Sequence, residues 1–184
     1  MIPEHDTTAP VGVFGLGNVL MGDDALGPTV IAHLQAGYDF PPEVHLEDLG
    51  TPGLDLHPHL AGRKTIILVD VVKSPGDAGA MRLYRREEIL RHAPGVRVSP
   101  HDPGVKEALL ALQFADDEPE VLLVGVIPDR IDHATGMTDA VRTAVTVAQE
   151  EVLAELERLG FPAVKKAPCG VPDLWWEKGR DGRG

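Results

Sequence analysis

Three side chains in this sequence combine residue types and positions that suit metal or acid–base chemistry. Asp24 closes a glycine-rich stretch, Asp70 follows an apolar run and His101 precedes a helical pattern. Two carboxylates and an imidazole, with room for further ligands, form a reasonable site for a divalent transition metal. A carboxylate at the same place can instead act as a general base. Asp24 and Asp70 are therefore also the candidate catalytic residues.

Each of these residues also has a plain structural interpretation. Asp24 and its neighbour Asp23 stand at the start of a helical pattern, where the helix dipole favours carboxylates and Asp is a good N-cap. The structural interpretation of Asp70 is a residue that ends a strand, and that of His101 is a histidine in an exposed loop. Capping accounts for one of the two adjacent acids, and the second is free to face a crevice. Asp48, at the end of another apolar segment, is a fourth candidate with a weaker claim.

Other active-site chemistries fit the sequence poorly. The glycine-rich stretch has Leu20 where a dinucleotide site of the Gly-x-Gly-x-x-Gly type needs its third glycine. Neither Ser74 nor Ser99 lies in a Gly-x-Ser-x-Gly elbow. Cys169 follows the last helical pattern in a segment with Pro and Gly, a poor place for an oriented nucleophile. The sequence contains no His-Glu-x-x-His zinc motif, and His57-Pro58-His59 is interpreted as a surface turn.

The spacing of apolar residues predicts the elements that position the candidate site. Predicted strands cover 11–14, 44–49, 65–69, 81–84 and 121–127, and predicted helices cover about 26–34, 54–60, 105–112 and 138–159. Continuous apolar runs are typical of parallel strands buried on both faces, and the 81–84 strand is expected to be antiparallel or at an edge. This alternation predicts an α/β fold in three layers: an open, mostly parallel twisted sheet of about five strands with helices on both faces. Ligands bind outside the carboxyl ends of strands in such sheets, which is where Asp24 and Asp70 are expected.

The chain length of 184 residues suits one domain with an ordinary core. We expect a flexible leader at 1–10, a single α/β domain at 11–164 and a mobile tail at 165–184. Both tryptophans of the chain, Trp175 and Trp176, lie in that tail. They either anchor a partner or fold back on the surface of the domain, and the sequence leaves both open.

Composition and charge argue against a nucleic-acid partner, a membrane span and secretion. A formal net charge of −12 argues against a nucleic-acid partner, because binding to phosphates needs a basic surface. The sequence contains no apolar run long enough to span a membrane and no signal peptide. The single cysteine cannot form an internal disulfide. A cytoplasmic location is the natural expectation.

Short motifs follow one another in a fixed order between about residues 11 and 160: Gly15-x-Gly17-Asn18-x-Leu20-x-x-Asp23-Asp24, Gly50-Thr51-x-Gly53, Ile67-Leu68-Val69-Asp70, Ser99-Pro100-His101 and Leu123-Val124-Gly125-Val126-Ile127-Pro128. In this order they resemble the motifs of the hydrogenase maturation proteases, the endopeptidases that trim the C-terminal extension of the large subunit of nickel–iron hydrogenases. Family members often have Gly at the position of Ala25 and Gln at that of Asp102. The segment after Leu159 has no recognised counterpart.

The resemblance implies a function and a set of site residues. Asp24, Asp70 and His101 match the metal-contacting positions of the family. The metal is expected to be nickel supplied by the substrate, and its presence reports that insertion of the cofactor is complete. The partner is expected to be the precursor of the large subunit, and no nucleotide is expected. Whether the metal polarises the scissile carbonyl, activates water or only positions the chain stays open. Two other classes also stay open: a metallohydrolase with its own ion, and a non-catalytic module that binds the large subunit.

Overall fold

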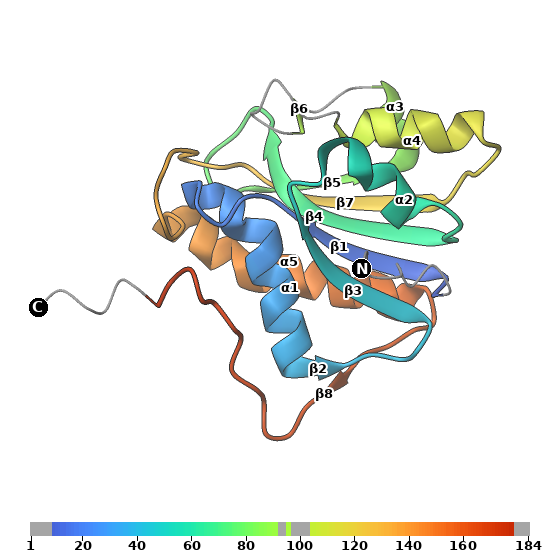
Figure 1. The fold of residues 1–184 in the computed structure, drawn as a ribbon. Helices are drawn as coiled ribbons and strands as arrows, with labels where there is room; N and C mark the ends of the chain where they lie inside the picture. Colours follow the sequence, from blue (N-terminus) through green and yellow to red (C-terminus); the bar gives the residue numbers. More distant parts are fainter. Residues whose placement is uncertain (1–8, 92–94, 97–103, 179–184) are drawn as a thin grey trace, which may run out of the picture.

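The computed structural model describes residues 9–91, 95–96 and 104–178, and its main sheet has the strand order β3-β1-β4-β7-β5 (Figure 1). The strands are β1 (Val11–Leu16), β3 (Val44–Gly50), β4 (Thr65–Lys73), β5 (Met81–Arg85) and β7 (Glu120–Val126). Strands β3, β1, β4 and β7 run parallel, whereas β5 pairs antiparallel with β7 at the edge. The predicted open, mostly parallel sheet and the antiparallel edge strand are both confirmed.

Two short pairings complete the strand set. Strand β6 (Gly95–Val96) pairs antiparallel with the end of β4, and β2 (Tyr38–Asp39) pairs antiparallel with β8 (Val164–Lys165). Two-residue strands such as these carry no periodic signal, so the apolar pattern did not predict them.

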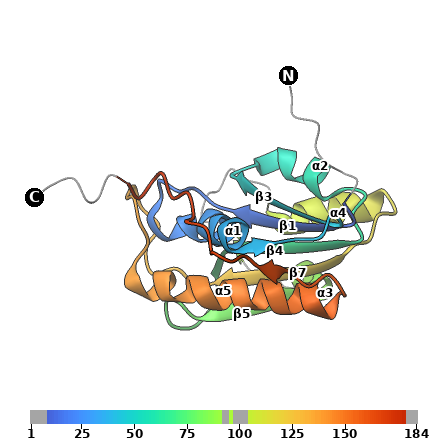
Figure 2. The same cartoon turned by 90° about the horizontal axis from the view of Figure 1, so that it is seen from below.

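Helices cover both faces of the sheet, and Figure 2 shows the resulting layers edge-on. One face packs against α1 (Leu26–Gly37) and α5 (Asp139–Arg158). The other packs against α2 (Leu56–Leu60), α3 (Arg86–Arg91) and α4 (Val105–Phe114). Successive side chains of a strand point to opposite faces, so β4 contributes Ile67 to the first core and Leu68 to the second. This explains why its sequence is a continuous apolar run rather than an alternating one.

Two helices follow the predicted apolar spacing closely. Helix α4 buries Val105, Ala108, Leu109 and Leu112, and α5 buries a stripe that runs from Val141 to Leu156. The last helix stops before Gly160, which has φ +85°, a left-handed conformation that glycine adopts without strain.

Strand β4 is longer than its apolar run suggests, and this changes the place of Asp70. The sequence pattern put Asp70 at the end of a strand over 65–69, but β4 continues to Lys73. It continues because β7 pairs with it as far as Val71 and β6 pairs with Val72 and Lys73. Strand β1, on the other side, stops pairing with β4 at Val69. Asp70 therefore lies inside β4, yet directly past the end of the neighbouring strand β1.

The C-terminal segment, expected to be a mobile tail, follows helix α1 over its described residues 165–178 (Figures 1 and 2). The expected domain boundary after residue 164 falls inside β8, which is held by β2. Trp176 is only 7% exposed, so this tryptophan folds back on the domain. Trp175 remains 59% exposed. Among the described residues, no helix is long and apolar enough to cross a membrane.

An ion network ties the far end of α5 to the sheet. Glu155, 5% exposed, accepts hydrogen bonds from Arg85 of β5, with Nη2 to Oε2 at 3.0 Å, and from Arg158 one turn later, with Nε to Oε2 at 2.9 Å. Arg158 also pairs with Glu120 at the start of β7. The hydrogen bonds from Arg158 and Arg85 lower the pKa of the Glu155 carboxyl from 4.5 to about 2.

This pKa shift predicts a pH-dependent contribution to stability. Because the folded-state pKa lies below that of the unfolded chain, the network stabilises the fold above about pH 4.5 and loses its effect as the pH falls toward 2. We expect Glu155→Gln to lower the unfolding free energy by about 2 kcal/mol at pH 6, and the difference from wild type to shrink toward pH 2.5. Urea unfolding at several pH values measures this. Glu157→Gln, an exposed change on the same helix, is the control, and a pH-independent difference would contradict the assignment.

Candidate functional site

Asp24 lies in a turn that leaves the carboxyl end of β1 and enters α1. The turn starts at Gly17, which has φ +137°, and passes through a 3-10 helix, η1 (Gly22–Ala25). A Cβ atom on Gly17 would lie 1.9 Å from the carbonyl oxygen of Asp24, so only glycine allows the turn to close this tightly. The Asn18 backbone N–H donates a hydrogen bond of 2.7 Å to Oδ2 of Asp24. The Asp24 carboxylate is thus bound within its own turn.

The capping interpretation of Asp24 is not what the structure shows. The N-cap positions of η1 and α1 are Met21 and Ala25, whose side chains offer no capping oxygen. Asp24 sits between these two positions and is partly exposed. Its carboxylate therefore remains a candidate for chemistry.

The neighbouring residue, Asp23, has a different task that the sequence did not reveal. Its side chain is fully buried and its carboxylate accepts four hydrogen bonds. The donors are the backbone N–H groups of Asp129, Arg130 and Thr138, at 2.9, 2.8 and 2.6 Å, and the Thr138 hydroxyl at 3.0 Å. All four come from the loop between β7 and α5. Asp23 therefore joins this loop to the turn that carries Asp24.

Backbone contacts reinforce the same connection. The Gly22 N–H donates to the Ala134 carbonyl at 2.8 Å, the Asp23 N–H donates to Arg130 at 3.0 Å, and the Ala134 N–H donates to Leu20 at 3.2 Å. These bonds run in both directions between the two loops. The Asp24 turn is consequently fixed on both sides, by the β7–α5 loop and by its own glycine.

Asp70 is fully buried at the same edge of the sheet. Its Oδ1 accepts a hydrogen bond of 2.8 Å from the Val71 N–H. Since Leu68 and Val72 of the same strand belong to the core under α2, α3 and α4, alternation places the Asp70 side chain on that face too. Helix α4 on this face begins at Val105.

Gly27 brings the Asp24 turn against Asp70. A Cβ atom on Gly27 would lie 2.2 Å from the carbonyl oxygen of Leu16 and 2.6 Å from that of Val69, the residue before Asp70. The first turn of α1 thus touches the backbone of both β1 and β4, and η1 itself contacts β4. Asp24, three residues before Gly27, and Asp70 are thereby brought to one edge of the sheet. This is the carboxyl edge, where ligands bind in open α/β sheets.

The third predicted ligand, His101, lies outside the described residues. Within the described residues 9–91, 95–96 and 104–178, no group of three His, Cys, Asp or Glu side chains is arranged to hold a metal ion. Asp24 and Asp70 on their own supply two carboxylates. A pair of carboxylates can bind a cation that brings other ligands with it, or can accept a proton from an attacking water.

The weaker candidates have other surroundings. Asp48, near the end of β3, accepts the Gly50 N–H at 2.8 Å, and the Gly50 carbonyl accepts the Gly17 N–H at 2.8 Å. The second glycine loop is therefore tied to the first. His59 is not the surface-turn residue that the sequence suggested: its side chain is 12% exposed, and its Nδ1 lies 3.7 Å from Oε2 of Glu47.

Comparison with known proteins finds hydrogenase maturation proteases among the relatives of this chain. A family model described as hydrogenase maturation protease matches residues 28–155, a range that includes Asp70 and His101 and begins four residues after Asp24. The hydrogenase 2 maturation protease of Escherichia coli K12 is 35% identical over 159 residues, which cover 84% of this chain and 94% of the relative. The hydrogenase expression/formation protein HoxM of Cupriavidus necator is 31% identical over 152 residues, covering 82% and 75% of the two chains.

Solved structures agree with the sequence relatives. The hydrogenase maturating endopeptidase HybD from Escherichia coli superimposes with a TM-score of 0.78 at 32% identity, covering 86% of this chain and 98% of that one. The maturation protease HybD from Thermococcus kodakarensis gives a TM-score of 0.63 at 25% identity, covering 81% and 97%.

The two adjacent aspartates are expected to respond to the same substitution with losses of stability of different size. Asp23→Asn replaces one acceptor oxygen by an NH₂ group that faces buried donors, so we expect a loss of about 2–4 kcal/mol of unfolding free energy. Asp24→Asn, partly exposed and held by the Asn18 N–H, is the matched control and is expected to lose less than about 1 kcal/mol. Urea unfolding of both variants measures the difference. Equal losses would show that Asp23 does not bear the special structural role.

Proposed function

Because the chain belongs to the hydrogenase maturation protease family, we propose that it cuts its substrate at the carboxyl edge of the sheet, beside Asp24 and Asp70. The protein is an endopeptidase that processes the large subunit of a hydrogenase. The observation that supports this place for cleavage is the close contact of Gly27 with Leu16 and Val69, which brings the two carboxylate-bearing segments together.

The substrate in this proposal is a large-subunit precursor that already carries nickel, and the cut removes its C-terminal extension. Asp24, Asp70 and His101 would bind the nickel ion while it remains attached to the precursor. Carboxylate oxygens and imidazole nitrogen are both suitable ligands for such an ion. His101 comes shortly before α4 in the sequence, and α4 packs on the face that holds Asp70.

The proposed ligand set favours a metal ion that the substrate supplies. Three protein ligands are fewer than the four that structural metal sites usually present, so the free enzyme is expected to bind the ion weakly. The precursor completes the coordination, and a precursor without nickel lacks the cation that attracts these carboxylates. The same ion would polarise the scissile carbonyl or lower the pKa of an attacking water.

A cytoplasmic site of action is also part of the proposal. The chain has one cysteine, Cys169, which is free and exposed. A reducing compartment keeps such a thiol unpaired.

The first functional prediction concerns Asp70. Asp70→Asn keeps the shape of the side chain and most of its hydrogen bonding but removes the negative charge that a metal ion or a proton needs. We expect cleavage of nickel-loaded precursor to fall by at least about 10³-fold, with a thermal midpoint within a few degrees of wild type. Asp77→Asn, at an exposed position in the β4–β5 connection, is the control. Normal cleavage by Asp70→Asn would remove the residue from the site, and global unfolding would make it structural.

The second prediction separates a nickel checkpoint from the alternatives. Wild-type enzyme is expected to cut nickel-loaded precursor and to leave nickel-free precursor intact, and His101→Ala is expected to cut neither form efficiently, because imidazole is a favoured nickel ligand. The measurement is the mass of the large subunit after incubation. Equal cutting of both forms would reject the checkpoint. A stoichiometric ion that stays in the purified enzyme through chelator dialysis would favour a metallohydrolase with its own ion.

A further inference from the structure

The C-terminal segment after β8 forms part of a groove beside α1. Along α1, the Lys166 N–H donates to the Gly37 carbonyl at 2.9 Å, and the Gly170 N–H donates to the Ala36 carbonyl at 3.0 Å. Further on, Arg142 of α5 pairs with Glu177 at 3.2 Å. The segment is therefore fastened to both helices of this layer, as its path in Figures 1 and 2 shows.

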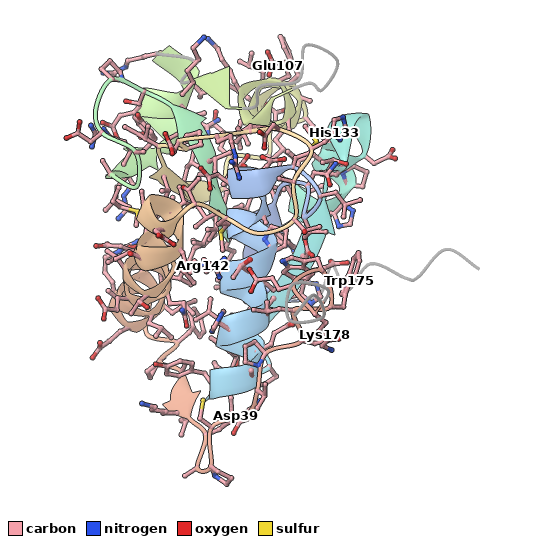
Figure 3. All side chains as sticks on the ribbon, turned by 90° about the vertical axis from the view of Figure 1, so that its left-hand side faces the viewer. Asp39, Glu107, His133, Arg142, Trp175 and Lys178 are labelled. Carbon is pink, nitrogen blue, oxygen red and sulfur yellow. The ribbon has the colours of Figure 1, made fainter. Side chains whose placement is uncertain are left out.

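Between this segment, α1 and the end of β3 lies a groove of about 420 Å³. Its apolar wall is α1, through Pro28, Ile31 and Ala32, and its other wall carries Trp175 and Trp176. The two indole rings meet edge to face, with centroids 5.7 Å apart and an interplanar angle of 88°. Buried Trp176 thus supports Trp175, whose ring stays largely exposed. Figure 3 shows Trp175 on the same side of the molecule as Lys178.

The charges at the groove favour a cation. Asp173 and Asp48 both line it, and Asp173 is paired with Lys178 at 2.6 Å. Among the described residues, Asp48 has no Lys or Arg partner, and its carboxylate accepts a hydrogen bond from the Gly50 N–H. Although the side chain is exposed at the rim, the carboxyl is partly desolvated by the chain around it, and this raises its pKa above the ordinary value. Desolvation deprives the Asp48 carboxylate of part of its hydration. A cation bound beside it would stabilise the charged form instead.

The groove lies next to the candidate active site along β3. Asp48 is two residues before Gly50, whose carbonyl binds the Gly17 N–H, and Gly17 packs against the backbone of Asp24. These contacts join the end of the groove at Asp48 to the turn that carries Asp24.

We propose that this groove binds an arginine side chain, with an apolar neighbour, from an extended segment of the protein substrate. The guanidinium would stack on the exposed face of Trp175 with its charge directed to Asp48, because an indole face and a carboxylate both attract this cation. The apolar neighbour would contact Pro28 and Ala32 on α1. The identity of the substrate rests on the function proposed above, whereas the binding of the arginine side chain does not.

The position of both tryptophans makes the binding directly measurable. The chain contains two tryptophans, and both line the groove, so intrinsic fluorescence reports its occupancy. The probe is the peptide acetyl-Ala-Arg-Leu-Ala-amide, and its matched control contains citrulline, which is neutral and nearly isosteric with arginine. We expect a saturable change with the arginine peptide and about tenfold weaker binding of the citrulline peptide. Equal binding of the two peptides, or no saturable change with either, overturns the proposal.

Variants assign the binding to the named side chains and to the substrate. Asp48→Asn is expected to weaken binding of the arginine peptide to the level of the citrulline peptide. Trp175→Leu, which keeps apolar bulk and leaves Trp176 as the reporter, is expected to raise KM for precursor cleavage about tenfold, with the effect on KM rather than kcat. Phe114→Ala, at an apolar position 90% exposed at the end of α4, is the control and is expected to match wild type. Wild-type peptide binding by Asp48→Asn, or a wild-type KM for Trp175→Leu, overturns the proposal.

The outcomes also separate this proposal from the proposed cleavage site. Fluorescence titration requires neither nickel nor cleavage, so a failure of the metal checkpoint leaves its result unchanged. Conversely, cleavage of nickel-loaded precursor with no arginine-dependent binding would retain the function and reject the groove.

Discussion

The contact that organises this structure is the close approach of helix α1 to the ends of two parallel strands. Gly27 presses against the carbonyl oxygens of Leu16 and Val69, at distances that a side chain would not allow. A helix that starts this close to the sheet places the preceding turn directly over the carboxyl edge. The position of Asp24 relative to Asp70 follows from this contact, and so does the place of any substrate that needs both carboxylates.

Two adjacent residues of one type, Asp23 and Asp24, lie in different surroundings, and only Asp24 remains a candidate for chemistry. The Asp23 carboxylate accepts four hydrogen bonds from the β7–α5 loop. The Asp24 carboxylate is partly exposed and accepts a hydrogen bond within its own turn. A buried carboxylate that is fully hydrogen-bonded is rigid and stabilising, and it holds its neighbour in place. The candidate site therefore combines a fixed turn with a partly exposed carboxylate, an arrangement that suits the positioning of a reacting group.

The C-terminal segment adds a second surface beside the candidate site. The match to the E. coli HybD structure covers 98% of that chain but 86% of this one. Part of this chain therefore has no equivalent in that structure. A processing enzyme must distinguish its substrate from similar large subunits, and contacts remote from the cut can supply that discrimination. A groove built from Trp175, Asp48 and the face of α1 offers such contacts next to the site.

The sequence by itself determined the layered fold, the antiparallel edge strand and two of the candidate residues, because buried runs, helical spacing and glycine-rich turns are local patterns. Asp24 and Asp70 were named from those patterns, and the resemblance to a family added what the site acts on. Only the tertiary structure decided that β4 continues past Asp70, that Asp23 holds the β7–α5 loop, and that Trp176 is buried against the domain. Each of these depends on partners distant in sequence, for example Thr138 for Asp23. Such partners leave no periodic trace around the residue itself, so local pattern cannot assign them.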